Sequence, residues 1–198
     1  MKSIVLHTIA VFFLLMMITL PAFGDDLSDL LDEVEKVGIS WEGFQLAKVL
    51  TKKQKTDSVK NRVPGTIPGT YKFKSGDLFV VAHSKTDRVI LMYEQHEAAT
   101  EKKMREILGK LFFEFGDPAV MAHDKVIYWV YNKRGKITEK EYNRIKAGGE
   151  KLNALASVKL NSSHAITTNS KEEAEAVTFD NIYYIITSGP ILKEITGK

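Results

Sequence analysis

The stretch YKFKSGDLFVVAHSKTDRVILMYEQ, residues 71–95, predicts the fold more clearly than any other part of the chain. It contains two apolar runs, at about 77–83 and 88–94, and a polar turn of four residues, 84–87, joins them. Two such runs around a short polar turn are typical of a β-hairpin. Both runs are apolar at successive positions, which indicates strands that are covered on two faces or lie centrally in a sheet.

An amphipathic helix is predicted directly after this hairpin, over residues 101–115, with Thr100 as its N-cap. Its apolar stripe consists of Met104, Ile107, Leu108, Leu111, Phe112 and Phe115. Gly116 and Pro118 then end the helix. The β-branched and aromatic residues of KVIYWVYN, 125–132, predict a third strand.

The last third of the chain continues the alternation of helices and strands. We predict a helix from the capping box Thr138/Glu141 to Gly148-Gly149, a strand over 156–160, a short helix opened by the capping box Ser170/Glu173, a strand over 181–188 and a terminal helix over 190–196. The order β-β-α-β followed by α-β-α-β predicts an α+β fold, with helices packed on a mostly antiparallel sheet.

The N-terminus has the three-part layout of a cleavable secretory signal peptide, residues 1–24. Lys2 is followed by a long apolar run, and the small residues Ala22 and Gly24 precede two acids. We therefore expect cleavage after Gly24 and no later transmembrane segment. An uncleaved membrane anchor is the alternative.

Beyond residue 24 the chain divides into three predicted parts. Residues 25–50 form an N-terminal helical segment, with helices over 25–37 and 40–50, the second burying Trp41, Phe44, Ala47 and Leu50. Residues 51–70 are polar, basic and punctuated by two Pro-Gly pairs, which predicts a linker or exposed loop. This stretch could also offer a surface to an anionic lipid or a polyanionic partner. The α+β domain then covers 71–198.

The composition excludes several classes of function. The chain contains no cysteine, so disulfides, thiol catalysis and thiolate metal sites are absent. Its 28 Lys and Arg against 25 Asp and Glu give a net charge of only +3, which is not typical of a protein that binds nucleic acid. An exported chain without disulfides fits a bacterial periplasm better than a eukaryotic secretory pathway.

The run from helix 101–115 through FGDP (115–118) to VIYWVY (126–131) resembles a segment of small bacterial envelope modules of the SmpA/OmlA type. The β-lactamase-inhibitory proteins share this local pattern, and the resemblance covers about residues 100–132. The chain departs from it in two ways: it has no lipidation cysteine, and a hairpin precedes the helix where those modules have another helix. The resemblance implies a non-catalytic binding or assembly role in the envelope and transfers no functional residues.

Catalytic groups are sparse in the predicted domain. Four histidines follow the signal peptide, at His83, His96, His123 and His164, and their spacing matches no common metal motif. A zinc site at His123 with Asp124 or Asp77 stays an alternative. No nucleophile elbow G-x-S-x-G is present, whereas the 25 acids leave paired-carboxylate chemistry open. A metal- or carboxylate-dependent hydrolase is therefore the enzymatic alternative, and we predict no cofactor.

Aromatic residues on two predicted strands are the strongest candidates for a binding site. Alternation sends Tyr128 to one face and Trp129 and Tyr131 to the other, and Tyr183 and Tyr184 follow on the last strand. If helices cover one face only, the other exposes an aromatic patch, whereas a sheet covered on both faces makes these residues core. The predicted binding residues are Trp129, Tyr128 and Tyr131, with His123 and Asp124 where the strand begins.

The preferred hypothesis is therefore an exported, periplasmic or secreted, non-catalytic module. It would bind a protein or another envelope component through its sheet or its basic stretch. Two alternatives to this hypothesis remain: the hydrolase, and a small-ligand carrier with a pocket between the sheet and helix 101–115.

Overall fold

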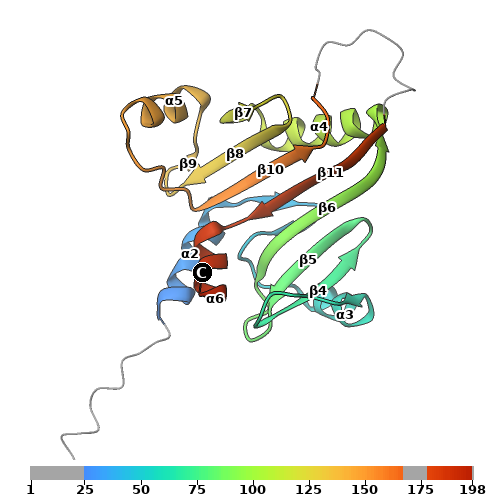
Figure 1. Cartoon of the computed structure of the whole chain (residues 1–198). Coiled ribbons are helices and arrows are strands. Elements are labelled where there is room, and N and C mark those ends of the chain that lie inside the picture. Colours follow the sequence, from blue (N-terminus) through green and yellow to red (C-terminus); the bar gives the residue numbers. More distant parts are fainter. Residues whose placement is uncertain (1–24, 167–177, 198) are drawn as a thin grey trace, which may run out of the picture.

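The computed structural model describes residues 25–166 and 178–197. Figure 1 shows a long twisted sheet with helices around it. In chain order the elements are α2 (Asp25–Val37), β1 (Ser40–Trp41), β2 (Phe44–Gln45), α3 (Lys52–Lys60), β3 (Arg62–Val63), β4 (Thr70–Ser75), β5 (Leu78–His83), β6 (Val89–Thr100), α4 (Glu101–Phe115), β7 (Val120–Ala122), β8 (Val126–Asn132), β9 (Gly135–Lys136), α5 (Glu139–Ala147), β10 (Ala156–Ser162), β11 (Thr178–Thr187) and α6 (Gly189–Thr196).

The main sheet has nine strands within the described residues, in the order β3-β4-β5-β6-β11-β10-β8-β7, with β9 paired to β8. Every neighbouring pair in it is antiparallel. The hairpin predicted from residues 71–95 is present as β5 and β6, and both are inner strands of the sheet. The predicted α+β fold with a mostly antiparallel sheet is therefore confirmed.

One face of the sheet, which we call the covered face, carries most of the core. A row of completely buried side chains crosses five strands on it in register: Val80, Met92, Ile186, Val158 and Trp129. The apolar stripe of α4 packs on this face, and α2, the β1–β2 segment and α6 contribute to the same core. In Figure 1 both α4 and the β1–β2 segment lie behind the sheet.

The helix predicted over 40–50 is wrong. This segment forms the β1–β2 hairpin, with Gly43 at a φ of 84° in its turn, and then continues as a loop. The loop is held by backbone hydrogen bonds to β6, from Ala47 N to Val89 O (2.7 Å) and from Val89 N to Lys48 O (3.0 Å). The four residues predicted to be buried, Trp41, Phe44, Ala47 and Leu50, are buried. Their spacing fits both structures, and long-range hydrogen bonds select the extended one.

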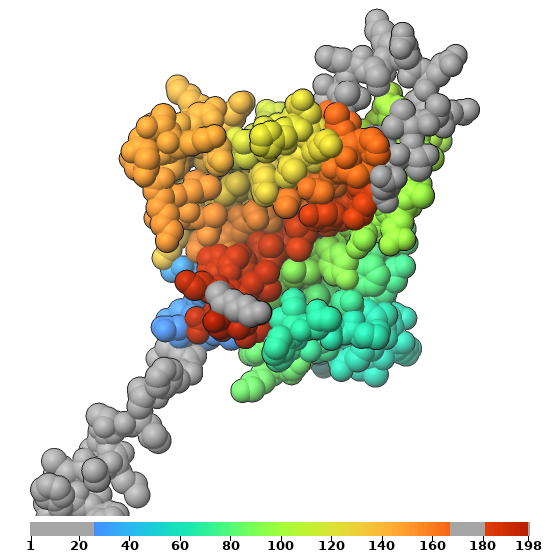
Figure 2. All heavy atoms as spheres, in the orientation of Figure 1, coloured from blue at the N-terminus to red at the C-terminus, as the bar shows by residue number. Residues whose placement is uncertain are grey.

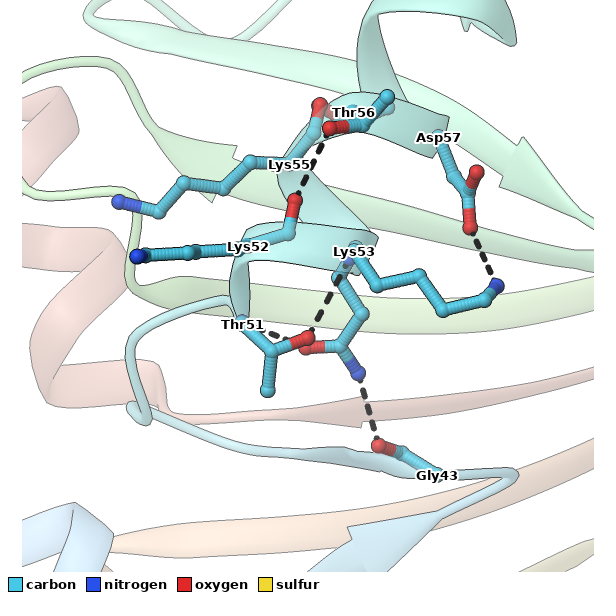
Figure 3. Close-up of polar contacts among 9 residues, drawn as sticks. Gly43, Thr51, Lys52, Lys53, Lys55, Thr56 and Asp57 are labelled. Carbon is cyan, nitrogen blue, oxygen red and sulfur yellow. Dashed lines mark hydrogen bonds and ion pairs between the residues drawn. The ribbon is translucent and has the colours of Figure 1, made fainter.

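Residues 51–70 are not a linker throughout, because they contain α3. Thr51 caps this helix with a capping box, in which its side chain accepts from Gln54 N (3.3 Å) and Gln54 Oε1 accepts from Thr51 N (2.8 Å) (Figure 3). The Gln54 amide also donates to Gly43 O (2.9 Å). Ser58 is the one fully buried residue of α3, so the helix lacks the apolar stripe that would have predicted it.

The other predicted elements agree with the structure at their centres. Thr100 caps α4 by accepting from Lys103 N (3.2 Å), and Gly116 follows the helix with a φ of 65°. The elements α5, β8, β10, β11 and α6 also fall on predicted segments, whereas β4 and the short strands β3, β7 and β9 were not predicted. The predicted capping box Ser170/Glu173 lies outside the described residues.

Candidate functional site

The second face of the main sheet carries a different kind of side chain. One row crosses six strands in register, and Lys72 and Tyr183 lie beside it on β4 and β11. The row consists of Lys74, Phe79, Tyr93, Ile185, Lys159 and Tyr128. We call these eight residues the lysine–tyrosine face. All of them are half-buried or exposed, and in Figure 2 atoms of β10, β11 and β6 (orange, red and green) lie at the surface on this side.

On the β4–β6 side of this face, two lysines lie over an aromatic pair. The rings of Phe79 and Tyr93 stack with centroids 4.9 Å apart and an interplanar angle of 16°. The ammonium groups of Lys72 and Lys74 are each 5.4 Å from the Phe79 centroid. Lys72 also donates to the Tyr93 hydroxyl at 3.4 Å. These distances lie within the range of cation–π attraction, so the rings hold the two charges at the surface of the sheet.

On the β8–β11 side, Lys159 lies between two tyrosines. Its ammonium group is 5.7 Å from the ring centroid of Tyr128 and 5.8 Å from that of Tyr183. Partial burial by itself lowers the pKa of Lys159, but interactions with the hydroxyls of Tyr128 and Tyr183 outweigh it and raise the pKa. Lys159 is therefore a cation at neutral pH.

The lysines of this face are not neutralised by neighbouring acids. Among residues 25–166 and 178–197, no carboxylate forms an ion pair with Lys72 or Lys159. Lys74 has only a long contact of 3.9 Å to Asp77, with both side chains largely exposed. Since β4 and β10 are four strand spacings apart, the two groups of cations are roughly 19 Å from one another. The face thus offers two separate attachment points for negative charge.

Two segments border the lysine–tyrosine face. Near β8, the chain around α5 covers the sheet with a small second core, which contains Val130 and Ile137 and packs against Tyr142. Near β4, the loop 64–69 lies beside a groove of about 220 Å³. The sheet is therefore covered on both sides around Val130, and Tyr128 packs against this second core while it stays half-buried. The alternative that both faces of the sheet are core holds at this end only.

Two of the predicted binding residues belong to the core. Trp129 is completely buried, its ring packs edge-on against Phe112 and its indole N–H donates to Gly116 O at 2.6 Å. Tyr131 is also buried, and burial, together with the charge of Glu114, raises its pKa to about 12. The prediction that Trp129 and Tyr131 form a binding surface is therefore wrong, because α4 packs on the face that they share.

Tyr128 lies on the opposite face from Trp129, as the alternation predicted, and Tyr183 accompanies it while Tyr184 points into the core. The sequence reasoning missed Phe79, Tyr93 and the three lysines. Alternation along residues 71–95 contains part of the signal, because it places Lys72 and Lys74 on one face. Which side chains then meet across the sheet depends on the strand order, and the local pattern does not contain that order.

His123 and Asp124 form the turn between β7 and β8. Both are exposed and both have positive φ, 51° and 52°, which the tight connection between these paired strands requires. No group of three or more His, Asp and Glu side chains able to hold a metal ion occurs in the described part of the chain. Among the described residues, no third ligand joins His123 and Asp124, and the turn between β7 and β8 accounts for both residues.

A buried polar network crosses the covered face. Trp41 Nε1 donates to the Tyr184 hydroxyl at 2.7 Å, and this hydroxyl donates to Glu94 in a short hydrogen bond. His96 Nε2 is 2.9 Å from the second oxygen of Glu94. Burial, together with the adjacent Glu94 carboxylate, strongly raises the pKa of Tyr184. The cavity beside this network measures only about 10 Å³, which is the room of a single water and not of a substrate.

The space between α4 and the sheet is filled by core side chains. Met104, Ile107, Leu111 and Phe115 of the helix are buried against the covered face. The pocket that a small-ligand carrier would need was predicted at this place, and packing occupies it. A groove does occur on the other face, beside the loop 64–69.

Comparison of the chain with protein-family models, with curated proteins and with solved structures finds no match. Its function must therefore be inferred from its own residues. Within 25–166 and 178–197, the helices are too short or too polar to cross a membrane.

Proposed function

We propose that this protein is exported to the periplasm, or secreted, and acts there as a non-catalytic module. It binds an anionic component of the cell envelope through the lysine–tyrosine face. The observation that carries the proposal is the contrast between the two faces of one sheet. The covered face holds the core, while the other presents Lys72 and Lys159, which have no carboxylate partner among the described residues, next to half-buried rings.

The chemistry of this face suits attachment. Tyrosine rings provide flat apolar area at low cost in side-chain entropy, and their hydroxyls can exchange hydrogen bonds with a polar partner. Lysines in a largely uncompensated group attract negative charge and speed association. Export is supported by the signal-like layout of residues 1–24, and for an exported chain the lack of cysteine favours a bacterial periplasm over a eukaryotic secretory pathway. The resemblance of residues 100–132 to small envelope modules favours the same kind of role.

A retention assay tests this proposal. The purified protein is immobilised and incubated with a detergent-solubilised bacterial envelope extract, and the bound material is quantified at low and at high salt. We expect the wild-type protein to retain an anionic component, with retention falling as salt rises. The Lys159→Glu variant should retain at most about one tenth as much, because it places a like charge at one of the two cationic points of the face.

The matched control is Lys102→Glu, which reverses the charge of an exposed lysine on α4, the helix that packs on the covered face. This variant should retain as much as the wild type. Equal losses in the two variants, or retention that does not respond to Lys159→Glu, would mean that the lysine–tyrosine face is not the binding surface.

A further inference from the structure

The groove at the β4 end of the lysine–tyrosine face is a defined feature of the fold. Its outer wall is the loop 64–69, which is held by hydrogen bonds at its C-terminal end, from Thr70 Oγ1 to Ile67 O (2.7 Å) and from Ser84 N to Gly69 O (2.9 Å). The floor is formed by neighbouring strands of the sheet. The groove is lined by Gly65, Thr66, Ile67, Thr70, Lys72, Val81, Leu91, Tyr93 and Ile185.

The lining is mostly apolar and has one charged residue. Ile67 supplies the apolar wall, and Val81, Leu91 and Ile185 supply the floor. Among the described residues that line the groove, Lys72 is the only ionic side chain, and its Nζ contacts the Tyr93 hydroxyl. A ligand that complements this groove has an apolar body and one negative charge at its end.

The size of the groove limits the ligand further. A volume of about 220 Å³ is below the range of typical pockets for drug-sized molecules, roughly 300–1,000 Å³. A narrow, flexible alkyl chain can fill such a space along the apolar lining. A single carboxylate matches the point charge of Lys72, whereas dianionic phosphates are better matched by several donors or by arginine.

We propose that this groove binds a free, single-chain anionic amphiphile, a long-chain carboxylate, with its alkyl chain along Ile67, Leu91 and Ile185 and its carboxylate on Lys72. This inference rests on the proposed function, because it takes the lysine–tyrosine face as the binding surface, and it names the class of ligand held at one end of that face.

The test is a titration of the full chain with dodecanoate below its micelle concentration, followed by methyl NMR of protein labelled at isoleucine δ1 carbons. The signals of Ile67 and Ile185 should shift with saturation, while that of Ile107, a buried residue of α4 on the covered face, should not move. The cationic amphiphile dodecyltrimethylammonium has the same chain length and should bind at least about tenfold more weakly.

Two lysine variants test whether the ammonium group of Lys72 holds the carboxylate of the ligand. Lys72→Met keeps most of the side-chain length and removes the ammonium group, so the affinity for dodecanoate should fall at least about tenfold, as expected for a lost charge-assisted hydrogen bond. Lys60→Met, on the exposed end of α3, should bind like the wild type. Circular dichroism of both variants verifies that the fold is retained.

Three results would overturn the inference: no shift of the Ile67 and Ile185 signals, equal affinity for the anionic and the cationic amphiphile, or unchanged affinity in Lys72→Met. Co-sedimentation with phosphatidylglycerol vesicles without any dodecanoate binding would also overturn it, in favour of a membrane surface as the partner. The proposed function is tested separately through Lys159, on the other side of the face, so it can survive when the inference about the groove fails.

Discussion

The hydroxyl of Tyr184 joins two buried groups, and its removal should destabilise the protein strongly. Tyr184 is 1% exposed and Glu94 is 6% exposed, so neither can exchange its partner for bulk water. In Tyr184→Phe, the Glu94 carboxylate loses a charge-assisted hydrogen bond, which contributes about 1.5–3 kcal/mol. The indole N–H of Trp41 loses its acceptor as well, at about 1 kcal/mol. We expect the free energy of unfolding to fall by about 3 kcal/mol.

Urea denaturation followed by tryptophan fluorescence measures this change, because Trp41 and Trp129 are both buried and report on unfolding. The adjacent substitution Tyr183→Phe is the matched control. It removes the same atom from the lysine–tyrosine face, where solvent can replace the contact, and should change the stability by less than about 0.5 kcal/mol. If Tyr184→Phe costs less than about 1 kcal/mol, or as little as Tyr183→Phe, the network does not stabilise the fold as the geometry indicates.

Further predictions concern α3 and its neighbours. The interaction with Lys55 (2.7 Å) is the larger cause that lowers the pKa of Asp87, and the hydrogen bond from Tyr71 is the second. The ionised carboxylate therefore stabilises the fold fully at pH values above its ordinary pKa, and this contribution is lost as the pH falls through the lowered pKa. Asp87→Asn should therefore destabilise at pH 7 more than at pH 3 in urea titrations, and an equal loss at both values would contradict this. Burial, followed by the bond to Asp87, raises the pKa of Tyr71 to about 12 from 10, so its stabilising effect is present below pH 10 and lost between pH 10 and about 12. Tyr71→Phe should flatten this alkaline loss in thermal melts. Thr51→Ala, which removes the capping box with Gln54, should cost about 1 kcal/mol and speed amide exchange in α3, and unchanged exchange would argue against the cap.

The parts of the fold that could be predicted from the sequence are those in which local pattern and final packing agree. Helix α4 has a regular apolar stripe, an N-cap at Thr100 and a glycine at its end, and the structure keeps all three. The strands β5, β6 and β8 are rich in β-branched and aromatic residues, and all of them form. These elements were predictable because their own residues specify them.

The N-terminal part could not be predicted in the same way. The buried positions of residues 40–50 fit a helix as well as a hairpin, and the choice depends on hydrogen bonds to β6, far along the chain. The helix α3 buries almost none of its side chains, so its sequence has no apolar periodicity that would predict a helix. The Thr51/Gln54 capping box was the one local signal of this helix.

The site shows the same limit. The sequence located aromatic residues on β8, but whether Trp129 or Tyr128 faces solvent depends on which face α4 covers. The rings and lysines that accompany Tyr128 come from strands that are neighbours only through the order β4-β5-β6-β11-β10-β8. Long-range pairing of this kind is a property of the whole fold and has no signature in any short stretch.

The central claim is that partners bind on the lysine–tyrosine face, and site-specific photocrosslinking tests it most directly. A photoreactive benzoylphenylalanine replaces Tyr183 on this face in one protein and Phe113 in a second. Phe113 is 91% exposed on α4, the helix that packs on the covered face. Both proteins are irradiated in envelope extract, and their adducts are compared on gels and by mass spectrometry. The account predicts specific adducts from position 183 and none above background from position 113. Adducts of equal yield at the two positions, or from position 113 alone, would contradict it.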